Sequence, residues 1–390
     1  MKRFLSLALA LLMALSILVS CAPSEEPLTP ENTNPQTQET PEVTDPPAVE
    51  TDAPTEPTDA PTEPTEPEVE LTVFPLTVTD QIGNEVTIEA PAERIVSGYY
   101  ISSSTCLALG LQDKLVATEE KIEARPIYGL SAPDLIGNIG NVGSAKAFDL
   151  EACLAAEPDL VILPSRAKDY GETLTEMGIP TIIVNPESHE QLVEMVTLIG
   201  QLTGAEEAAN KLIDRYDEVI AKVNDLTADL TEDDKPLVYM SGTSSYLTTA
   251  PKDMYQSSVI TSAGGINAAQ DIDGDYWVDV SYEQLIAMNP DVIIIPTNNM
   301  ANGQPDFSAE ELMADEVLAE VAAVANGAVY NMPAGYEAWD SPVPSGVLGM
   351  LWMLSTLHPD LYSLDEFALD AQDFYKTFYG FEMDTATILY

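Results

Sequence analysis

A pattern of helix, tight turn and buried strand occurs twice in this 390-residue chain, and it restricts the fold more than any other feature. The first copy runs from Asp149 to Pro164, and the second, 132 residues later, runs from Ser281 to Pro296. Each copy contains Pro-Asp followed by an uninterrupted apolar run. Strands without polar alternation suit a parallel sheet that is covered on both faces. The pattern therefore predicts an α/β fold with two lobes, each with its own sheet.

Other apolar runs predict further strands. A turn at 80–84 separates two short strands and predicts a hairpin, and a helix is expected from about Ser103 to Leu111. The expected strands outside the repeated pattern span 76–79, 86–88, 94–97, 181–184 and 236–240.

A long helical stretch separates the two lobes. Apolar residues recur at helical spacing over 190–202 and again over 205–226. The second helix, of about 22 residues, is roughly 33 Å long, which is enough to bridge two lobes. Open α/β sheets bind ligands at the carboxyl ends of their strands. Two such lobes facing each other predict a ligand site in the cleft between them.

The N-terminal segment is an export signal rather than part of the fold. Lys2 and Arg3 precede an apolar run from Phe4 to Val19, which is short for a membrane span. The run ends in Leu18-Val19-Ser20-Cys21, which resembles the lipobox of bacterial lipoproteins. We expect residues 1–20 to be removed and Cys21 to carry the lipid, with a simple signal peptide or signal anchor as the alternative.

A stalk follows the lipidation signal. Residues 22–70 contain 12 Pro, 10 Thr, 14 Asp or Glu and no Lys or Arg, and the heptad Asp-Ala-Pro-Thr-Glu-Pro-Thr occurs twice, at 52–58 and 59–65. This composition buries too little apolar surface to offset chain entropy, so 21–70 is expected to be an acidic, disordered spacer. Glycosylation of its threonines is a secondary possibility.

Charge and composition exclude several functions. With 15 Lys or Arg against 65 Asp or Glu, the formal net charge is −50, which argues against nucleic acid as a partner. Two histidines and three cysteines are too few for a His-rich metal site or a disulfide scaffold. Cys106 and Cys153 lie among apolar residues and are expected to be buried thiols.

Several segments, in order, resemble one family. The motifs lie in 77–97, in the two Pro-Asp strands at 150–162 and 289–294, and in Ala263-Gly264-Gly265-Ile266-Asn267-Ala268. Together they resemble the binding proteins of ABC importers for iron-siderophores, haem and cobalamin, which are class III, helical-backbone periplasmic binding proteins. The resemblance implies two Rossmann-like lobes, at 71–203 and 231–390, joined by a rigid helix within 204–230.

The family resemblance implies function as well as fold. It implies a monomeric, extracytoplasmic receptor, lipid-anchored to the cell membrane, that captures an iron chelate or corrinoid and delivers it to a membrane permease and its ATPase. No catalysis, resident metal or cofactor is implied, because the chelate is cargo.

The candidate ligand-binding residues follow expected strand ends or lie in polar loops. They are Tyr99, Tyr100, Arg166, Tyr246, Tyr276, Trp277, Asn298, Tyr336 and Trp339, with Ser165, Asn185, Glu187, Ser244, Ser245, Asn299 and Asp340 beside them. Aromatic faces stack on flat macrocycles, and Arg166 or Arg125 is suited to a ligand anion. The alternative for each aromatic residue is core packing.

Two exposed acidic positions are candidates for docking to the permease. Family members dock through acidic residues on each lobe, and by their place in the motifs these are Asp169 and Asp253. Both are Asp where the family pattern usually has Glu.

Three other functions compete with the chelate receptor. The same fold is suited to a small oxyanion, such as molybdate or tungstate, or to a nickel–amino-acid complex. A metallocluster reductase subunit has this architecture but needs several cysteine ligands. A surface adhesion lipoprotein without a transport role is the third alternative.

Overall fold

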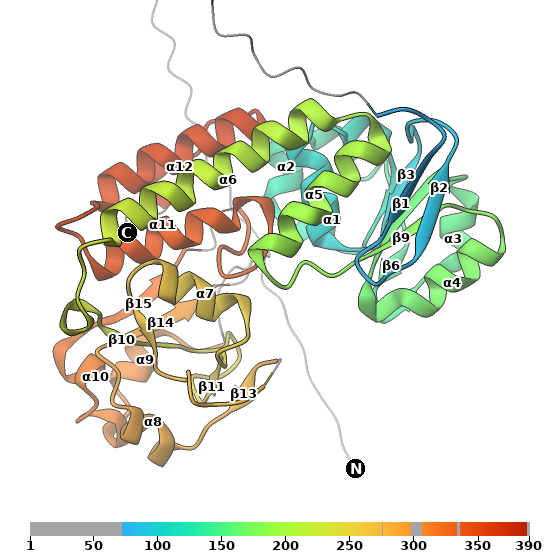
Figure 1. Cartoon of the computed structure of the whole chain (residues 1–390). Coiled ribbons are helices and arrows are strands. Elements are labelled where there is room, and N and C mark those ends of the chain that lie inside the picture. Colours follow the sequence, from blue (N-terminus) through green and yellow to red (C-terminus); the bar gives the residue numbers. More distant parts are fainter. Residues whose placement is uncertain (1–71, 275, 298–305, 334–335, 388–390) are drawn as a thin grey trace, which may run out of the picture. The chain divides into compact units, whose positions relative to one another are not determined.

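A computed structural model of the chain describes residues 72–387 except 275, 298–305, 334 and 335. The predicted signal peptide, Cys21 and the whole predicted stalk lie outside these residues. Among the described residues, no helix combines the length and apolar character that a membrane span needs. The described chain contains two separate parallel sheets, as the repeated pattern predicts (Figure 1).

The first sheet has five parallel strands and belongs to the N-terminal lobe. Its order is β5 (Gly140–Asn141), β4 (Leu115–Thr118), β3 (Ile95–Ser97), β8 (Leu160–Pro164) and β9 (Thr181–Val184). Every residue of β3, β8 and β9 is buried, which agrees with their largely apolar sequences. A hairpin of β1 (Leu76–Thr79) and β2 (Glu85–Ile88) precedes this sheet. The helices around it are α1 (Tyr100–Ala108), α2 (Pro126–Ser131), α3 (Leu150–Ala155), α4 (Lys168–Glu176) and α5 (His189–Thr203).

The second sheet has four parallel strands and belongs to the C-terminal lobe. Its order is β12 (Ile266–Asn267), β10 (Leu237–Met240), β14 (Val292–Pro296) and β15 (Val329–Met332). A small antiparallel pair, β11 (Thr248–Thr249) and β13 (Val278–Asp279), lies outside it. The helices of this lobe are α7 (Tyr255–Ser262), α8 (Tyr282–Met288), α9 (Ala309–Met313), α10 (Ala322–Asn326), α11 (Val347–Leu357) and α12 (Leu364–Tyr379).

The two copies of the repeated pattern begin with the helix caps that the sequence predicts. Asp149 accepts a hydrogen bond from the backbone N–H of Ala152 at the start of α3. Ser281 and Gln284 form a complete capping box at the start of α8. These caps satisfy backbone donors that the first helical turn leaves unpaired, so each copy starts its helix at a fixed residue.

The linking helix is α6 (Glu206–Thr227), within one residue of the predicted end. It packs against α5 on one side and α11 on another, and its Arg215 and Lys222 pair with Asp373 and Asp370 of α12. Figure 1 shows α6 lying alongside α11 and α12. Because the helix contacts elements of both lobes, it is suited to act as a stiff connection.

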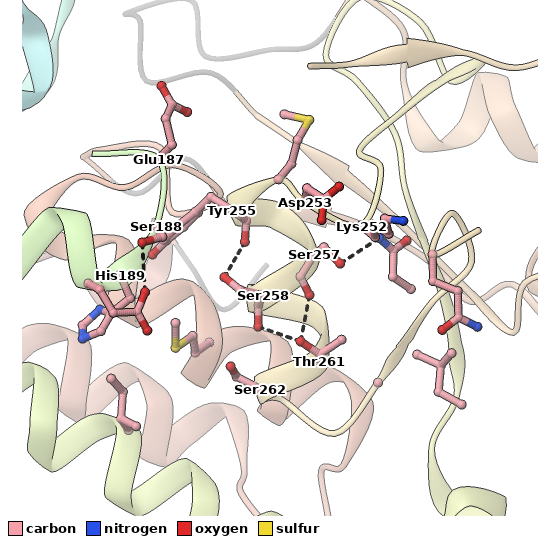
Figure 2. A pocket seen from close by; sticks show the side chains of 18 of the residues that line it. Glu187, Ser188, His189, Lys252, Asp253, Tyr255, Ser257, Ser258, Thr261 and Ser262 are labelled. Atoms are coloured by element: carbon pink, nitrogen blue, oxygen red, sulfur yellow. Dashed lines mark hydrogen bonds between the residues drawn. The ribbon is translucent and has the colours of Figure 1, made fainter. Parts of the chain in front are cut away.

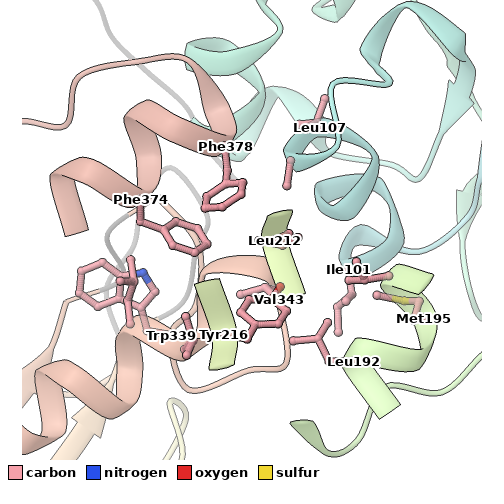
Figure 3. Packing of buried hydrophobic residues seen from close by; sticks show 14 of the residues in the cluster. Ile101, Leu107, Leu192, Met195, Leu212, Tyr216, Trp339, Val343, Phe374 and Phe378 are labelled. Atoms are coloured by element: carbon pink, nitrogen blue, oxygen red, sulfur yellow. The ribbon is translucent and has the colours of Figure 1, made fainter. Parts of the chain in front are cut away.

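A single apolar cluster runs through the linking helix into both lobes. Figure 3 shows side chains from α1, α5, α6, α12 and the segment before α11, namely Ile101, Leu107, Leu192, Met195, Leu212, Tyr216, Trp339, Val343, Phe374 and Phe378. All are at most 7% exposed. Since burial of apolar area is the main favourable contribution to folding, this shared core holds α1 against the C-terminal lobe.

One helix boundary differs from its prediction. The first helix was expected from about Ser103, but α1 begins at Tyr100, directly after Tyr99 in extended conformation. Ser102, Ser103, Ser104 and Thr105 are inside the helix and buried, and the hydroxyls of Ser102, Ser103 and Thr105 are hydrogen-bonded. A run of serines, which ordinarily favours caps and turns, is tolerated here because nearby acceptors satisfy these hydroxyls.

Candidate functional site

A cavity of about 460 Å³ lies between the two lobes, at the carboxyl ends of strands from both sheets. Tyr100 follows β3, the loop Gly242–Ser245 follows β10, and Thr297 follows β14. The other lining residues are Arg125, Thr248, Gln256, Tyr276, Trp277, Ala338, Asp340 and Ser341. Strand ends of open α/β sheets are where such folds bind ligands, and the volume suits a small molecule.

A second cavity, of about 350 Å³, extends this site on the N-terminal lobe. It shares Tyr100 and Arg125 with the first cavity and adds Tyr99, Glu119, Lys121 and Arg166, among others. The two cavities therefore adjoin at Tyr100 and Arg125, and we refer to them together as the cleft.

Arg125 is held in the cleft by a buried acid. The residue directly precedes α2, its side chain is 14% exposed, and its guanidinium lies 4.5 Å from the centroid of the Tyr100 ring. Its Nε is 3.9 Å from Oε1 of Glu119. Stacking and charge fix the plane of the guanidinium, which suits it to bind an anionic group.

Glu119 is surrounded by donors. It directly follows β4 and is 6% exposed. Its carboxylate accepts hydrogen bonds from the hydroxyls of Ser103 and Tyr128, the latter at 2.7 Å. Burial raises the pKa of this carboxyl, and these hydrogen bonds and Arg125 oppose the rise. The carboxyl is thus a satisfied part of the N-terminal wall.

Two tyrosines and a second arginine complete the N-terminal wall. The rings of Tyr99 and Tyr100 meet edge to face, with centroids 5.3 Å apart. The guanidinium of Arg166, an exposed residue, lies 5.8 Å from the centroid of Tyr99. Burial raises the pKa of the Tyr99 hydroxyl, so this phenol stays neutral at physiological pH. Among the described residues, no carboxylate lies within ion-pair distance of Arg166, which leaves its charge available to a ligand.

The C-terminal wall has a different chemistry. It consists mainly of hydroxyl groups, the exposed Tyr276, Trp277, and Asp340, which is only 7% exposed. Burial raises the pKa of Asp340 to about 6, and a hydrogen bond from the Gln256 side chain opposes this rise. In the part of the chain that the structure describes, neither Lys nor Arg lies within 4 Å of this carboxylate.

Of the nine predicted ligand-binding residues, five line the cleft, three do not, and Asn298 lies outside the described residues. Tyr99, Tyr100, Arg166, Tyr276 and Trp277 line the cleft, together with Ser244, Ser245 and Asp340. Ser165 and Asn185 hydrogen-bond to each other at 2.6 Å. Asn298 and Asn299 lie outside the described residues.

Three predicted aromatic residues are not in the cleft. Trp339 is fully buried, and its Nε1 donates to the Tyr375 hydroxyl at 2.9 Å. Tyr246 packs on Phe307 and donates to Asp315, and Tyr336 packs edge to face on Tyr375 and Phe381. Packing, the alternative for each aromatic residue, accounts for these three: Trp339 is in the core, and the half-buried Tyr246 and Tyr336 pack against core clusters.

Glu119, Gln256 and Thr297 line the cleft but were not predicted. Glu119 follows a strand that the sequence analysis did not identify, since Leu115–Thr118 is short and mixed in polarity. Thr297 directly follows the predicted strand β14, so its position at a strand end could have identified it as a candidate binding residue. Gln256 lies in the first turn of α7, and nothing in its local sequence marks it.

A larger cavity, of about 850 Å³, lies away from these residues. Figure 2 shows Glu187, Ser188 and His189 on one side and the hydroxyls of α7, such as Ser258 and Thr261, on the other. Glu187 and Asp253, which were predicted for the ligand site and the docking site, both line it.

The chemistry of this larger cavity does not favour an anionic ligand, because its lining includes Glu187, Glu190, Glu232 and Asp253. Its two lysines, Lys235 and Lys252, are paired with Glu232 and Asp273 at 2.7 and 2.9 Å. Burial lowers the pKa of His189, so this imidazole is neutral at pH 7. Asp169, the other predicted docking residue, is exposed in the first turn of α4.

Compared with known proteins, both the sequence and the fold are similar to those of substrate-binding proteins. The family model described as "Periplasmic binding protein" matches residues 95–336. An uncharacterized ABC transporter substrate-binding lipoprotein of Bacillus subtilis, YvrC, is 26% identical over 228 residues, which are 57% of this chain and 69% of that protein. A cobalamin-binding protein of Halobacterium salinarum is 26% identical over 290 residues, covering 73% of this chain and 74% of the relative.

A solved structure shares the two-lobed architecture. The molybdate periplasmic binding protein MolA of Haemophilus influenzae, bound to molybdate, superposes with a TM-score of 0.69 at 21% identity. The match covers 79% of this chain and 99% of that structure. At this identity the likeness establishes the fold.

Proposed function

The chain belongs to the periplasmic binding protein family, and on that premise we propose that it is the extracytoplasmic receptor of an ABC importer. It captures a metal chelate, either an iron chelate such as a siderophore or haem, or a corrinoid, and delivers it to a membrane permease without transforming it. The cargo is the only small molecule involved, and no resident cofactor is required.

The interlobe cleft carries this proposal. Its N-terminal wall holds two arginines and two tyrosines, and its C-terminal wall holds Tyr276 and Trp277. Flat aromatic faces bind macrocycles and aromatic chelating groups, and arginine binds their carboxylates. A ligand gripped from both lobes also favours the closed arrangement, which is the state that a permease distinguishes from the empty receptor.

A binding screen tests the cargo class. We expect haem, cobinamide or a ferric siderophore to bind the purified domain with a dissociation constant below the micromolar range in isothermal titration calorimetry. If none of these chelates bound at micromolar concentrations, metal chelates would be excluded as the cargo.

A small oxyanion or a nickel–amino-acid complex is the second candidate. The observation in its favour is the compactness of the cavity around Arg125, together with the fold shared with a molybdate-bound structure. Titration with molybdate, tungstate and nickel–histidine distinguishes this candidate from the first. A non-transport adhesion role is disfavoured by the charged cleft, which such a role does not use.

The membrane attachment and the permease contact belong to the same proposal. We expect the lipid on Cys21 to retain the protein in the membrane fraction and Cys21→Ala to release it. Asp169 and Asp253 are both exposed, as docking residues must be. Their replacement by Ala is expected to lower uptake by the assembled importer while leaving cargo affinity unchanged.

A further inference from the structure

Two charged side chains of opposite sign, one largely buried and one almost completely buried, line the 460 Å³ cavity from opposite lobes. Arg125 comes from the N-terminal lobe and Asp340 from the C-terminal lobe, and Tyr100 lines the cavity with them. The side chain of Arg125 is 14% exposed and Asp340 is 7% exposed. A cavity built in this way is complementary to a ligand with two chemically different ends.

Asp340 lacks the compensation that buried carboxylates ordinarily have. The acidic and phenolic groups that face it are Tyr100 of α1 and Tyr255 of α7. Its hydrogen bonds come from the Gln256 side chain and from a backbone N–H, and no Lys or Arg lies within 4 Å in the described parts of the chain. Removing a carboxylate from water without pairing it with a cation is unfavourable, so an arrangement that keeps one points to a ligand that compensates it.

A second buried acceptor lies in the same wall. Gln256 is 6% exposed and lines the same cavity. Its amide carbonyl oxygen, Oε1, is buried and has no hydrogen-bond partner in the described protein. Buried carbonyl oxygens are nearly always paired, so this one is an acceptor in need of a donor. Among the described residues, the C-terminal wall thus presents two acceptors, on the hydrogen-bonded side chains of Asp340 and Gln256, and no cation.

The geometry points to Asp340 and Gln256 as the pair that determines cargo specificity, by accepting hydrogen bonds from a protonated amine or amide N–H groups of the bound chelate. The anionic part of the same cargo then lies against Arg125 on the other wall. This inference rests on the proposed function and narrows it to chelates with a donor-bearing end. A bare oxyanion such as molybdate, which at neutral pH offers no donor, does not satisfy these acceptors.

The test compares probes that differ in donors. Ferrioxamine B has a terminal ammonium, and its N-acetylated form lacks that charge. The other probes, which differ further in their hydrogen-bond donors, are nickel–histidine, cobinamide, haem and molybdate. Calorimetry is performed on the wild-type protein, on Asp340→Asn, and on Asp233→Asn, a matched loss of charge at an exposed residue. For the donor-bearing probe that binds, we expect Asp340→Asn to weaken binding on the order of tenfold to a hundredfold and Asp233→Asn to leave it unchanged.

The outcomes separate this inference from the function on which it rests. If a chelate binds the wild-type protein but Asp340→Asn stays within threefold, the specificity role is wrong and the chelate receptor stands. Tighter binding of molybdate than of every donor-bearing probe also overturns the inference. If none of the probes binds, the proposed function itself fails. Thermal unfolding of Asp340→Asn confirms that its weaker binding does not arise from loss of the fold.

Discussion

Each wall of the cleft contains one buried acidic residue, and the two residues differ in the hydrogen-bond donors and cations around their carboxylates. On the N-terminal wall Glu119 has Ser103, Tyr128 and Arg125 around it. On the C-terminal wall Asp340 has the Gln256 side chain and no cation within 4 Å among described residues. From this comparison we infer that Glu119 stabilises the protein and positions Arg125, whereas Asp340 lowers the stability and is the acid that we propose for cargo binding.

The largest expected effect concerns Glu119. Replacing it with Leu leaves the Ser103 and Tyr128 hydroxyls and the Arg125 guanidinium without their shared acceptor. Breaking a buried charged pair from one side costs about 3–5 kcal/mol. We therefore expect Glu119→Leu to lower the free energy of unfolding by this amount in urea titrations, with Glu119→Gln as the milder control. A decrease in the free energy of unfolding of less than about 1 kcal/mol would contradict the structural role of Glu119.

The next effect is a pH dependence at Asp340. Its pKa is about 6 in the folded protein and 3.8 without burial, so the folded state binds the proton more tightly. Stability contributed by this group is therefore present at low pH and is lost as pH rises through about 6. At 1.36 kcal/mol for each pKa unit, this amounts to about 2–3 kcal/mol between pH 4 and pH 8.

Asp340→Asn should abolish this contribution. The difference in unfolding free energy between the variant and the wild-type protein is expected to shift in favour of the variant as pH rises from 4 to 8. Urea unfolding at both pH values measures it. A difference that is the same at the two pH values would show that Asp340 is not desolvated as described, and the contrast between the walls would disappear.

Arg166, the exposed arginine of the N-terminal wall, should affect binding more than stability. Arg166 is exposed and has no carboxylate within ion-pair distance in the described structure, so Arg166→Ala should leave the unfolding free energy within about 0.5 kcal/mol. Loss of a charge-assisted hydrogen bond should weaken binding of an anionic chelate roughly tenfold. Lys168→Ala, two residues away and also exposed, is the control. Equal effects of both replacements on calorimetric affinity would indicate a general charge effect instead.

The smallest effect is expected at Tyr276, which is 72% exposed. A stacking contact contributes about 0.5–1.5 kcal/mol, so Tyr276→Ala should weaken binding of an aromatic or macrocyclic chelate by a few-fold. Tyr330, 41% exposed on β15, provides a control replacement with no expected effect on affinity. An unchanged affinity in Tyr276→Ala would place the ligand deeper, toward Asp340.

Much of the fold could be predicted because its signals are local. The buried strands β8 and β14 are unbroken apolar runs, and the caps Asp149 and Ser281 precede them at a fixed spacing. The helix α6 shows its apolar stripe directly in the sequence. By contrast, β4 is short and contains Thr118, so its periodicity is ambiguous, and the site residue that follows it was missed.

The site could be predicted only in part, because the sequence does not show which way a loop aromatic residue points. Trp277 and Trp339 both lie in loop-like segments, yet one lines the cleft and the other is in the core. Gly349 explains the second case, since a Cβ at that position would lie 2.1 Å from the Trp339 carbonyl oxygen. Such close packing between distant residues becomes apparent only in three dimensions. The lobe boundaries and the lipid anchor remain predictions.

The most direct test of the account is to locate the metal of the bound cargo. The chelate that binds in calorimetry is co-crystallised with the protein, and anomalous diffraction is recorded at the absorption edge of its metal. We expect the anomalous peak in the cleft, between Arg125 and Tyr100 on one side and Trp277 and Asp340 on the other. A peak in the larger cavity of Figure 2, between His189 and Ser258, would contradict the assignment of the site.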